Sequence, residues 1–280
     1  MKKVSILIPY YGHEAFVQHT LDSVLADSYP SKQIVIINDG SPDDGDRIIR
    51  EWIATNGNRI EILYRNRENR GLNATLNELI DLSDGDYILL MDSDDMLLEG
   101  GIEKRVAFLE KHPRFKAVFA DATVVDREGN RIYESMLFDF RGYARGDFAD
   151  PQQLTKTLLR KFVLAGPIHL VRREIYDEVG MYDEGMVAED FDFTIRAMAK
   201  GYYAFLDEKV CAYRVHDENL TVDNVSMGFV RVLADARRSL LKNASLFPAS
   251  IQGYIYYKAF LFLLREKLMF LRVALQKELS

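Results

Sequence analysis

The sequence predicts an α/β protein in which a mainly parallel sheet is flanked by helices and followed by a helical extension. Two observations predict the sheet: five short apolar runs alternate with helix-spaced segments in the first half of the chain, and three acids directly follow one of those runs. Such alternation is typical of βαβ units with right-handed crossovers. A third observation, an apolar seam after residue 250, predicts the extension.

Each predicted strand is a short aliphatic run, and each predicted helix repeats apolar residues every three or four positions. The run from Ile88 to Met91 has no polar alternation, which is typical of a strand covered on both faces of a parallel sheet. In chain order, the predicted strands are 4–8, 33–37, 60–64, 87–91 and 117–120, and the helices between them are 14–26, 46–54, 72–82 and 101–111.

The pattern loosens from Asp121 to Gly166, where polar residues and glycines mix with aromatic ones. We expect this region to shape a binding face rather than a core. Regular structure returns in a segment over 170–179, a helix that opens near Glu189, and a strand over 210–215. Because no repeat or low-complexity linker interrupts the chain, the sequence predicts one continuous domain over residues 1–224 and an extension over 225–280.

The extension contains an apolar seam with alternating three- and four-residue spacing, which predicts a long helix. The seam consists of Tyr254, Tyr257, Leu261, Leu264, Leu268, Leu271 and Leu275, while Phe260, Leu263 and Phe270 widen it and Lys258, Arg265, Lys267 and Arg272 add positive charge. The helix could pack on the body of the protein, form a homodimer, or rest on a membrane surface. The sequence leaves these three alternatives open.

The composition limits the classes of function. A net charge of −7 and a pI near 5.4 argue against nucleic-acid binding. The single cysteine, Cys211, rules out an internal disulfide and indicates a reducing compartment. The apolar N-terminal run is interrupted by Pro9 and is too short for a signal peptide, and no run approaches the ~20 residues that span a bilayer. We therefore expect a cytoplasmic protein.

Three acids, Asp92, Asp94 and Asp95, follow the strand predicted over 87–91. They are expected at the carboxyl edge of the sheet, where open α/β sheets bind their ligands. Carboxylates this close raise one another's pKa unless a cation lies between them. Because oxygen ligands suit Mg²⁺ or Mn²⁺, the sequence predicts a divalent metal that holds a phosphate at this edge.

Two further segments of the first half could bind a nucleotide. Asp39 follows the second strand, where it could either form a turn or accept a hydrogen bond from a base. Arg70 and Gly71 open the helix over 72–82, whose N-terminus attracts phosphate, although a plain loop-to-helix junction would use the same residues.

The second half offers a candidate base and a candidate metal ligand. Glu189 and Asp190 begin a helix, where acids are favoured by the helix dipole but would also suit a general base. His216 ends the strand over 210–215, and a lone histidine is more often structural than a ligand. Motifs for dinucleotides, Walker A phosphate loops, serine hydrolases and zinc sites are absent from the sequence.

Taken in order over residues 3 to 221, these segments resemble the inverting glycosyltransferases of family 2, which have the GT-A fold with a Rossmann-like sheet. The resemblance rests on Val4 to Tyr11, Asn38 to Ser41, Asn69 to Ala74, Asp92 to Asp94, Gly166 to Asp183, Glu189 and Asp190 with Arg196, and Tyr213 to His216. Gly12 stands where the family often has Asn, and Ser28 where Gln is usual. These departures leave the choice of nucleotide base open.

The resemblance implies a nucleotide-binding half over residues 1–120 and an acceptor half over 121–224. It implies Asp190 as the catalytic base, Gly166 and Glu189 on the acceptor side, and Mn²⁺ or Mg²⁺ as the cofactor. The implied metal ligands are Asp92, Asp94 and His216, and the implied donor-binding residues are Pro9, Tyr10, Tyr11, Glu14, Asp39, Arg70, Gly71, Asn73, Asp92 and Ser93. Asp95 is then expected to cap the following helix.

The activity that the resemblance implies is inverting transfer of a sugar from a nucleotide-diphosphate donor, most simply a UDP-sugar, to a hydroxyl of a glycan or lipid-linked acceptor. Such a reaction would serve cell-surface polysaccharide or glycan biosynthesis, with a peripheral location at the inner face of the membrane if the C-terminal helix touches lipid. One alternative is a haloacid-dehalogenase-type phosphatase, although Met96 stands where that class has Thr or Val. The other alternative is a non-catalytic protein that binds a nucleotide-sugar or a glycan.

Overall fold

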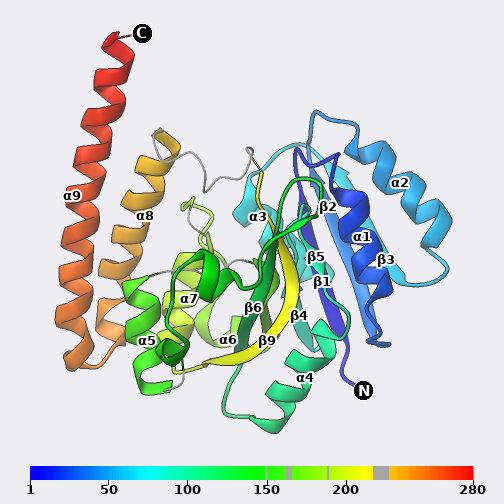
Figure 1. Cartoon of the computed structure of the whole chain (residues 1–280), viewed down its shortest axis with the longest axis horizontal. Coiled ribbons are helices and arrows are strands. Elements are labelled where there is room, and N and C mark those ends of the chain that lie inside the picture. The colour runs from blue at the N-terminus through cyan, green and yellow to red at the C-terminus, as the bar shows by residue number, and fades with distance from the viewer. Residues whose placement is uncertain (149–150, 162–165, 188, 217–226, 280) are drawn as a thin grey trace.

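The computed structural model of the chain describes all residues except 149–150, 162–165, 188, 217–226 and 280, together with the side chains of all but 151–152, 189 and 275–279 among them. A nine-stranded sheet runs through the molecule, with helices packed against it (Figure 1). Its strands are β1 (Val4–Tyr10), β2 (Lys32–Asp39), β3 (Glu61–Arg67), β4 (Tyr87–Leu90), β5 (Met96–Leu97), β6 (Ala117–Val125), β7 (Arg131–Tyr133), β8 (His169–Arg172) and β9 (Tyr203–Arg214).

In the first half of the chain, helices alternate with the parallel strands along the sequence, as the sequence pattern predicts. The α-helices are α1 (Val17–Ala26), α2 (Gly45–Asn56), α3 (Leu72–Leu82), α4 (Gly101–Lys111), α5 (Pro151–Arg160), α6 (Ile175–Val179), α7 (Glu189–Ala199), α8 (Met227–Asn243) and α9 (Ala249–Leu279). Four short helical turns complete the described elements: η1 (Met136–Phe140), η2 (Arg145–Phe148), η3 (Gly166–Ile168) and η4 (Ala244–Leu246).

The strand order is β3-β2-β1-β4-β8-β6-β9-β5, with β7 beside β6. Strands β1 to β4 pair in parallel, β8 runs antiparallel between β4 and β6, and β9 is parallel to β6. The α/β class with a parallel sheet at its centre is therefore confirmed. Because β1, β2 and β4 are parallel, the residues that follow their carboxyl ends meet at one edge of the sheet.

The central strands are buried on both faces, which explains their unbroken apolar runs. In β1, Ile6 and Ile8 pack into a cluster with α1, α2 and α4, whereas Leu7 points into a second cluster that contains α3. This second cluster continues through α7 and α8 as far as Ile255 and Ala259 of α9. The division of the chain at residue 224 stays a prediction, although the packing joins both sides of that point in one core.

The structure differs from the sequence-based expectation in three elements. Strand β9 begins at Tyr203 rather than near Val210, because its middle is polar and exposed at Asp207 and Glu208 and so lacks a strand pattern. Helix α8 lies in the predicted helical extension, but the sequence does not predict it as a separate helix, because cations interrupt its stripe of buried residues. The loose region after Asp121 contains the second half of β6, strand β7 and helix α5.

Helix α9 packs along α8 at the side of the molecule away from α1 and α2 (Figure 1). Its buried residues are Ile255, Ala259 and Val273, none of which belongs to the predicted seam. Helix α9 thus packs on the body of the protein, but not through Tyr257 and the seam residues from Leu261 to Leu271, which are exposed. Among the described residues, no helix is long and apolar enough to cross a membrane.

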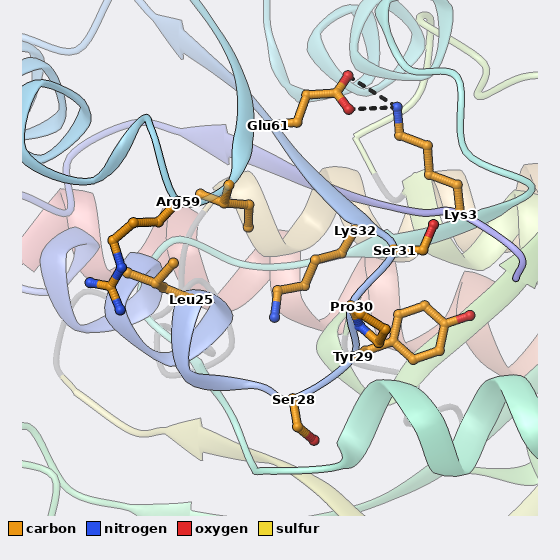
Figure 2. A pocket seen from close by; sticks show the side chains of 10 residues that line it. Lys3, Leu25, Ser28, Tyr29, Pro30, Ser31, Lys32, Arg59 and Glu61 are labelled. Carbon is orange, nitrogen blue, oxygen red and sulfur yellow. Dashed lines mark hydrogen bonds and ion pairs between the residues drawn. The ribbon is translucent and has the colours of Figure 1, made fainter.

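A cavity of about 500 Å³ opens near the amino ends of the parallel strands (Figure 2). Its lining includes Lys3, Lys32 and Arg59, and Lys3 forms an ion pair with Glu61. The predicted site residues follow the carboxyl ends of the same strands. The cavity is therefore at the wrong edge of the sheet to be part of the candidate site.

Candidate active site

The acidic turn after β4 is held rigidly by two neighbouring elements. The Thr20 hydroxyl on α1 donates to the backbone carbonyls of Ser93 (3.0 Å) and Asp95 (2.8 Å). Arg214 of β9 is fully buried and donates from Nε to the Asp94 carbonyl at 2.9 Å. These contacts hold the backbone of the acidic turn and do not themselves use a carboxylate.

Asp94 lies between two histidines from distant parts of the chain. The His216 Nε2 is 2.9 Å from Asp94 Oδ2, and the His13 Nδ1 is 3.9 Å from Asp94 Oδ1. His13 Nδ1 also lies 2.8 Å from the Ser93 hydroxyl. One potential ligand atom from each of His13, Asp94 and His216 lies within 4.8 Å of the other two. This is the spacing of donor atoms around a single cation.

The chemistry of this donor set fits a divalent metal. A carboxylate oxygen and two imidazole nitrogens suit a transition metal such as Mn²⁺ better than Mg²⁺, which prefers oxygen ligands only. Among the described residues, Asp92 does not belong to this cluster. His13 is not among the metal ligands predicted from the sequence. The only indication of such a role is its place just after β1, at the same edge of the sheet as the acidic turn.

Asp92 faces a different neighbour, Gly166, which the resemblance predicts on the acceptor side. A Cβ atom at position 166 would lie 3.2 Å from Asp92 Oδ2, so a glycine allows the carboxylate to approach the backbone closely. Burial and the charges of Asp94 and Asp190 raise the pKa of Asp92 to about 7. Burial also raises the pKa of Asp190, at the start of α7, to about 6. Asp92 is therefore electrostatically linked to both the metal cluster and the candidate base.

Asp95 does not cap the following helix, so that prediction is wrong. Its carboxylate is buried and its Oδ1 accepts the backbone N–H of Arg214 at 2.7 Å. The chain continues from Asp95 into β5, and α4 begins at Gly101. Burial, together with the charges of Asp94 and Asp92, raises the pKa of Asp95 well above its usual range. Asp95 fastens the acidic turn to β9.

Asp39 joins the second strand to the loop before α3. Its carboxylate accepts the backbone N–H groups of Arg70 (2.8 Å) and Gly71 (3.0 Å) and forms an ion pair with Arg67. Gly40 has φ +70°, and a Cβ there would lie 2.7 Å from the Asn69 nitrogen, so the two loops approach as closely as backbone permits. The carboxylate of Asp39 thus holds a second loop rather than a turn of its own, and base recognition by Asp39 stays a prediction.

The two other donor-binding candidates near α3 contact protein groups. Arg70 Nη1 donates to Glu78 at 3.2 Å, although the side chain of Arg70 is exposed. The Asn73 amide donates to the carbonyls of Asp183 and Met186, both at 2.6 Å. Asn73 therefore connects α3 with the segment that precedes α7.

The residues at the end of β1 divide into buried and exposed ones. Tyr10 is fully buried and its hydroxyl donates to Asp43 at 2.7 Å, so its ring belongs to the core. Glu14 accepts the backbone N–H of Asp44 at 2.7 Å. Pro9 is half-buried and Tyr11 is exposed. Of these four predicted donor contacts, Tyr11 is the side chain freest to meet a ligand.

Helix α7, which begins with the candidate base, is anchored by two residues further along it. The Asp192 carboxylate accepts hydrogen bonds from Ser239 (2.7 Å) and Asn243 (3.0 Å) of α8. Arg196 pairs with Asp192 and donates to the carbonyls of Gly180 (3.0 Å) and Met181 (2.8 Å). The side chain of the predicted acceptor-side residue Glu189 lies outside the described part of the structure.

Residues 5–180 match the family model described as "Glycosyl transferase family 2". This match covers more than half of the chain. The chain belongs to glycosyl transferase family 2. The membership confirms the resemblance drawn from the motifs, and it sets aside the phosphatase alternative because the matching family is one of glycosyl transferases.

Curated relatives of this family 2 chain carry the same class name. The putative glycosyltransferase EpsE of Bacillus subtilis (strain 168) is 34% identical over 129 residues, which are 46% of this chain and 46% of EpsE. An uncharacterized glycosyltransferase of Rickettsia typhi (strain Wilmington) is 24% identical over 220 residues, covering 78% of this chain and 65% of that protein. The chain spans less than half the length of EpsE.

Two solved structures have the same GT-A fold as this family 2 chain. One is Staphylococcus aureus TarS 1–349 in complex with UDP-GlcNAc, with a TM-score of 0.68 and 17% identity over 94% of this chain and 72% of that chain. The other is the mannosyltransferase PcManGT from Pyrobaculum calidifontis in complex with GDP-Man and Mn²⁺, with a TM-score of 0.67 and 16% identity over 98% of this chain and 75% of that chain.

Proposed function

We propose that this chain is an inverting glycosyltransferase that moves a sugar from a nucleotide-diphosphate donor, UDP-sugar first, to a hydroxyl of a glycan or lipid-linked acceptor. The observation that carries the proposal is a carboxylate of raised pKa, Asp190, electrostatically linked to the acidic turn after β4. Family membership and the donors named for TarS and PcManGT support it. A destination in cell-surface polysaccharide or glycan biosynthesis belongs to the same proposal.

Asp190 is proposed to take the proton from the acceptor hydroxyl as that oxygen attacks the anomeric carbon. A general base is most effective when its pKa lies near the working pH, and a pKa of about 6 makes Asp190 a stronger base than an exposed aspartate. Helix α7 supplies the rigid support that such a base needs, because Asp192 and Arg196 fix it to α8 and to the segment at 180–181. Attack from the face opposite the leaving diphosphate would invert the anomeric centre.

His13, Asp94 and His216 are proposed to hold a divalent cation, with Mn²⁺ preferred over Mg²⁺. When bound, such a cation neutralises charge on a departing diphosphate. His13 in place of Asp92 distinguishes this ligand set from the one that the resemblance implies, which consists of Asp92, Asp94 and His216. Asp92 is left to face Gly166 and the acceptor side.

The role of Asp190 predicts a large loss of rate in Asp190→Asn. Because an amide cannot accept the proton, transfer to the acceptor should fall by about 10²- to 10⁴-fold. Nucleotide release from UDP-GlcNAc and GDP-mannose, measured with Mn²⁺ and a panel of glycan acceptors, provides the readout. Asp177→Asn, at an exposed position of α6, is the matched control. Near-normal transfer by a folded Asp190→Asn protein would disprove this assignment.

The metal site predicts that His13→Ala, Asp94→Asn and His216→Ala each weaken Mn²⁺ binding by at least about tenfold. Electron paramagnetic resonance of free Mn²⁺ in a titration measures this affinity without any turnover. His19→Ala, an exposed histidine on α1, should bind Mn²⁺ as the unmodified protein does. Asp92→Asn separates the two ligand sets: a loss as large as that of Asp94→Asn, with no loss in His13→Ala, would restore the ligand set implied by the motif.

A further inference from the structure

The longest helix of the structure turns its most apolar side toward solvent. Helix α9 packs along α8, its buried residues are Ile255, Ala259 and Val273, and its Glu266 pairs with Arg237 of α8 at 3.0 Å. The opposite side carries Tyr257, Phe260, Leu261, Leu264, Leu268 and Leu271, with exposed fractions of 56%, 55%, 37%, 43%, 68% and 58%. We call these six side chains the outer face of α9.

The outer face is continuous rather than a scatter of exposed residues. At 100° per residue, its six members fall within about 100° of arc along four turns of helix. An isolated exposed leucine needs no explanation, but a contiguous apolar surface of this kind marks an interaction site. Figure 1 shows α9 at the rim of the molecule, on the far side of α8 from the sheet.

Positive charge borders the outer face. Arg265, Lys267 and Arg272 are exposed, and within the described part of the chain none of them forms an ion pair with a carboxylate. Glu266 is the sole acid among residues 249–274, and it is turned toward α8. The chain as a whole has a net charge of −7, so this basic border is a local feature.

The charges beside the outer face distinguish between two possible partners, a second copy of α9 and an anionic membrane surface. In a pair of α9 helices from two copies, the positions beside the seam would face each other. Cations directly follow Leu264 and Leu271, so like charges would oppose each other there. A bilayer with anionic lipids instead presents acyl chains to the leucines and phosphates to the basic border.

We propose that the outer face of α9 binds the surface of membranes that contain anionic lipids, with the helix lying in the plane of the interface. This inference goes beyond the proposed transfer reaction, because it concerns a surface formed by α9 and needs no turnover. Leu268 and Leu271 would enter the acyl boundary, while Lys267 and Arg272 would meet headgroup phosphates. Arg265, whose guanidinium lies over the Phe229 ring of α8 at 5.3 Å, would add positive charge beside them.

Vesicle co-sedimentation of the full chain tests the proposal. We expect binding to vesicles of equal parts phosphatidylcholine and phosphatidylglycerol that exceeds binding to pure phosphatidylcholine at least tenfold and weakens with added salt. Leu264→Glu combined with Leu268→Glu should abolish binding, because it places two charges in the apolar face. Arg265→Glu, Lys267→Glu and Arg272→Glu together should lower binding to anionic vesicles at least tenfold.

The matched control is Leu246→Glu, since Leu246 is 49% exposed but lies in η4, outside the outer face. It should bind vesicles as the unmodified chain does, and circular dichroism should show every variant folded. Absence of vesicle binding, or binding that survives Leu264→Glu with Leu268→Glu, would overturn the proposal. Light scattering that finds a dimer, broken by those two substitutions in a chain without lipid affinity, would assign the outer face to a second copy instead.

Discussion

At the scale of single residues, two fully buried arginines hold the segments on either side of Asp92. Arg214 donates to the carbonyls of Asp94, Asp126 and Arg127, while Arg105 donates to those of Gly101, Pro167 and His169. A buried carbonyl without a hydrogen-bond donor is costly, so each guanidinium stabilises a loop by donating to backbone carbonyls that no strand or helix partner reaches. The acidic turn and the segment at Pro167 to His169 are therefore fixed by buried side chains that bond to their backbone.

His169 allows a pH-dependent test of how a single buried residue contributes to stability. Its Nε2 is buried without a hydrogen-bond partner among the described residues, and its ring packs against Tyr203 at 5.6 Å. Burial, aided by the charge of Arg105, lowers the pKa of His169 to about 3. The folded state therefore keeps this ring neutral, while the unfolded state binds a proton below about pH 6.5. Its contribution to stability is complete above that pH and is lost as the pH falls toward 3.

We expect His169→Phe to lose less stability on acidification. Between pH 7 and pH 5, linkage predicts that the free energy of unfolding falls by about 2 kcal/mol more in the unmodified chain than in His169→Phe. Urea denaturation at both pH values measures the difference. His19→Phe, at an exposed position, is the control. Identical pH dependence of the His169→Phe and unmodified proteins would contradict a buried neutral imidazole.

At the scale of elements, α8 supports α7. Its buried polar residues Ser239 and Asn243 bond to Asp192, and Asp235 accepts the backbone N–H of Val187 at 2.6 Å. Helix α7, which carries Asp190, is thus supported by α8, a helix outside the residues that match the family model. Removal of residues 225–280 would expose the core contacts of α7, so point substitutions test α9 more cleanly than truncation does.

The Ser239 contact predicts a measurable link between α8 and catalysis. Ser239→Ala removes a hydrogen bond to a buried carboxylate and should lower the free energy of unfolding by about 1–3 kcal/mol. Because the position of Asp190 depends on α7, kcat should fall while nucleotide affinity stays unchanged. Ser245→Ala, at an exposed position of η4, is the matched control. Equal stability and kcat in the two variants would show that α8 does not support the base.

At the scale of the whole molecule, the sheet edge brings together residues from four distant segments: His13, Asp39, the acidic turn and His216. A ligand that binds this assembled edge stabilises the folded chain by mass action. Departures from the family pattern leave the base open, so UDP and GDP are both tested with Mn²⁺, and ADP serves as the comparison nucleotide. At about 100 times its dissociation constant, the preferred nucleotide should add about 2.7 kcal/mol to the free energy of unfolding.

A thermal-shift series with and without Mn²⁺ provides this measurement. For a chain of this size, the expected stabilisation corresponds to a rise in melting temperature of roughly 5–10 °C. Asp94→Asn should remove the Mn²⁺-dependent part of the rise and keep the melting temperature of the nucleotide-free protein within a few degrees. A rise of equal size with ADP would argue against a specific site for the sugar donor's nucleotide.

The parallel sheet could be predicted from the sequence, because its buried strands appear as unbroken apolar runs and the helices between them as apolar residues every three or four positions. The sequence also determined the edge at which the acids gather and, through the order of the motifs, the family. Short-range patterns sufficed there, since each depends on neighbours within one element. They failed at β9 and α8, whose apolar residues are diluted by charges that only their final positions explain.

Only the tertiary structure decided which candidates share one site. His13 joins Asp94 and His216 because β1, the acidic turn and β9 end close together, which no spacing along the chain reveals. The same packing places the Asp95 carboxylate against β9, where it accepts a hydrogen bond from Arg214 instead of capping a helix. The outer face of α9 was visible in the sequence as a seam, but its direction depended on which side α8 covers. A pattern records that an apolar face exists, whereas contact with the rest of the chain decides where it points.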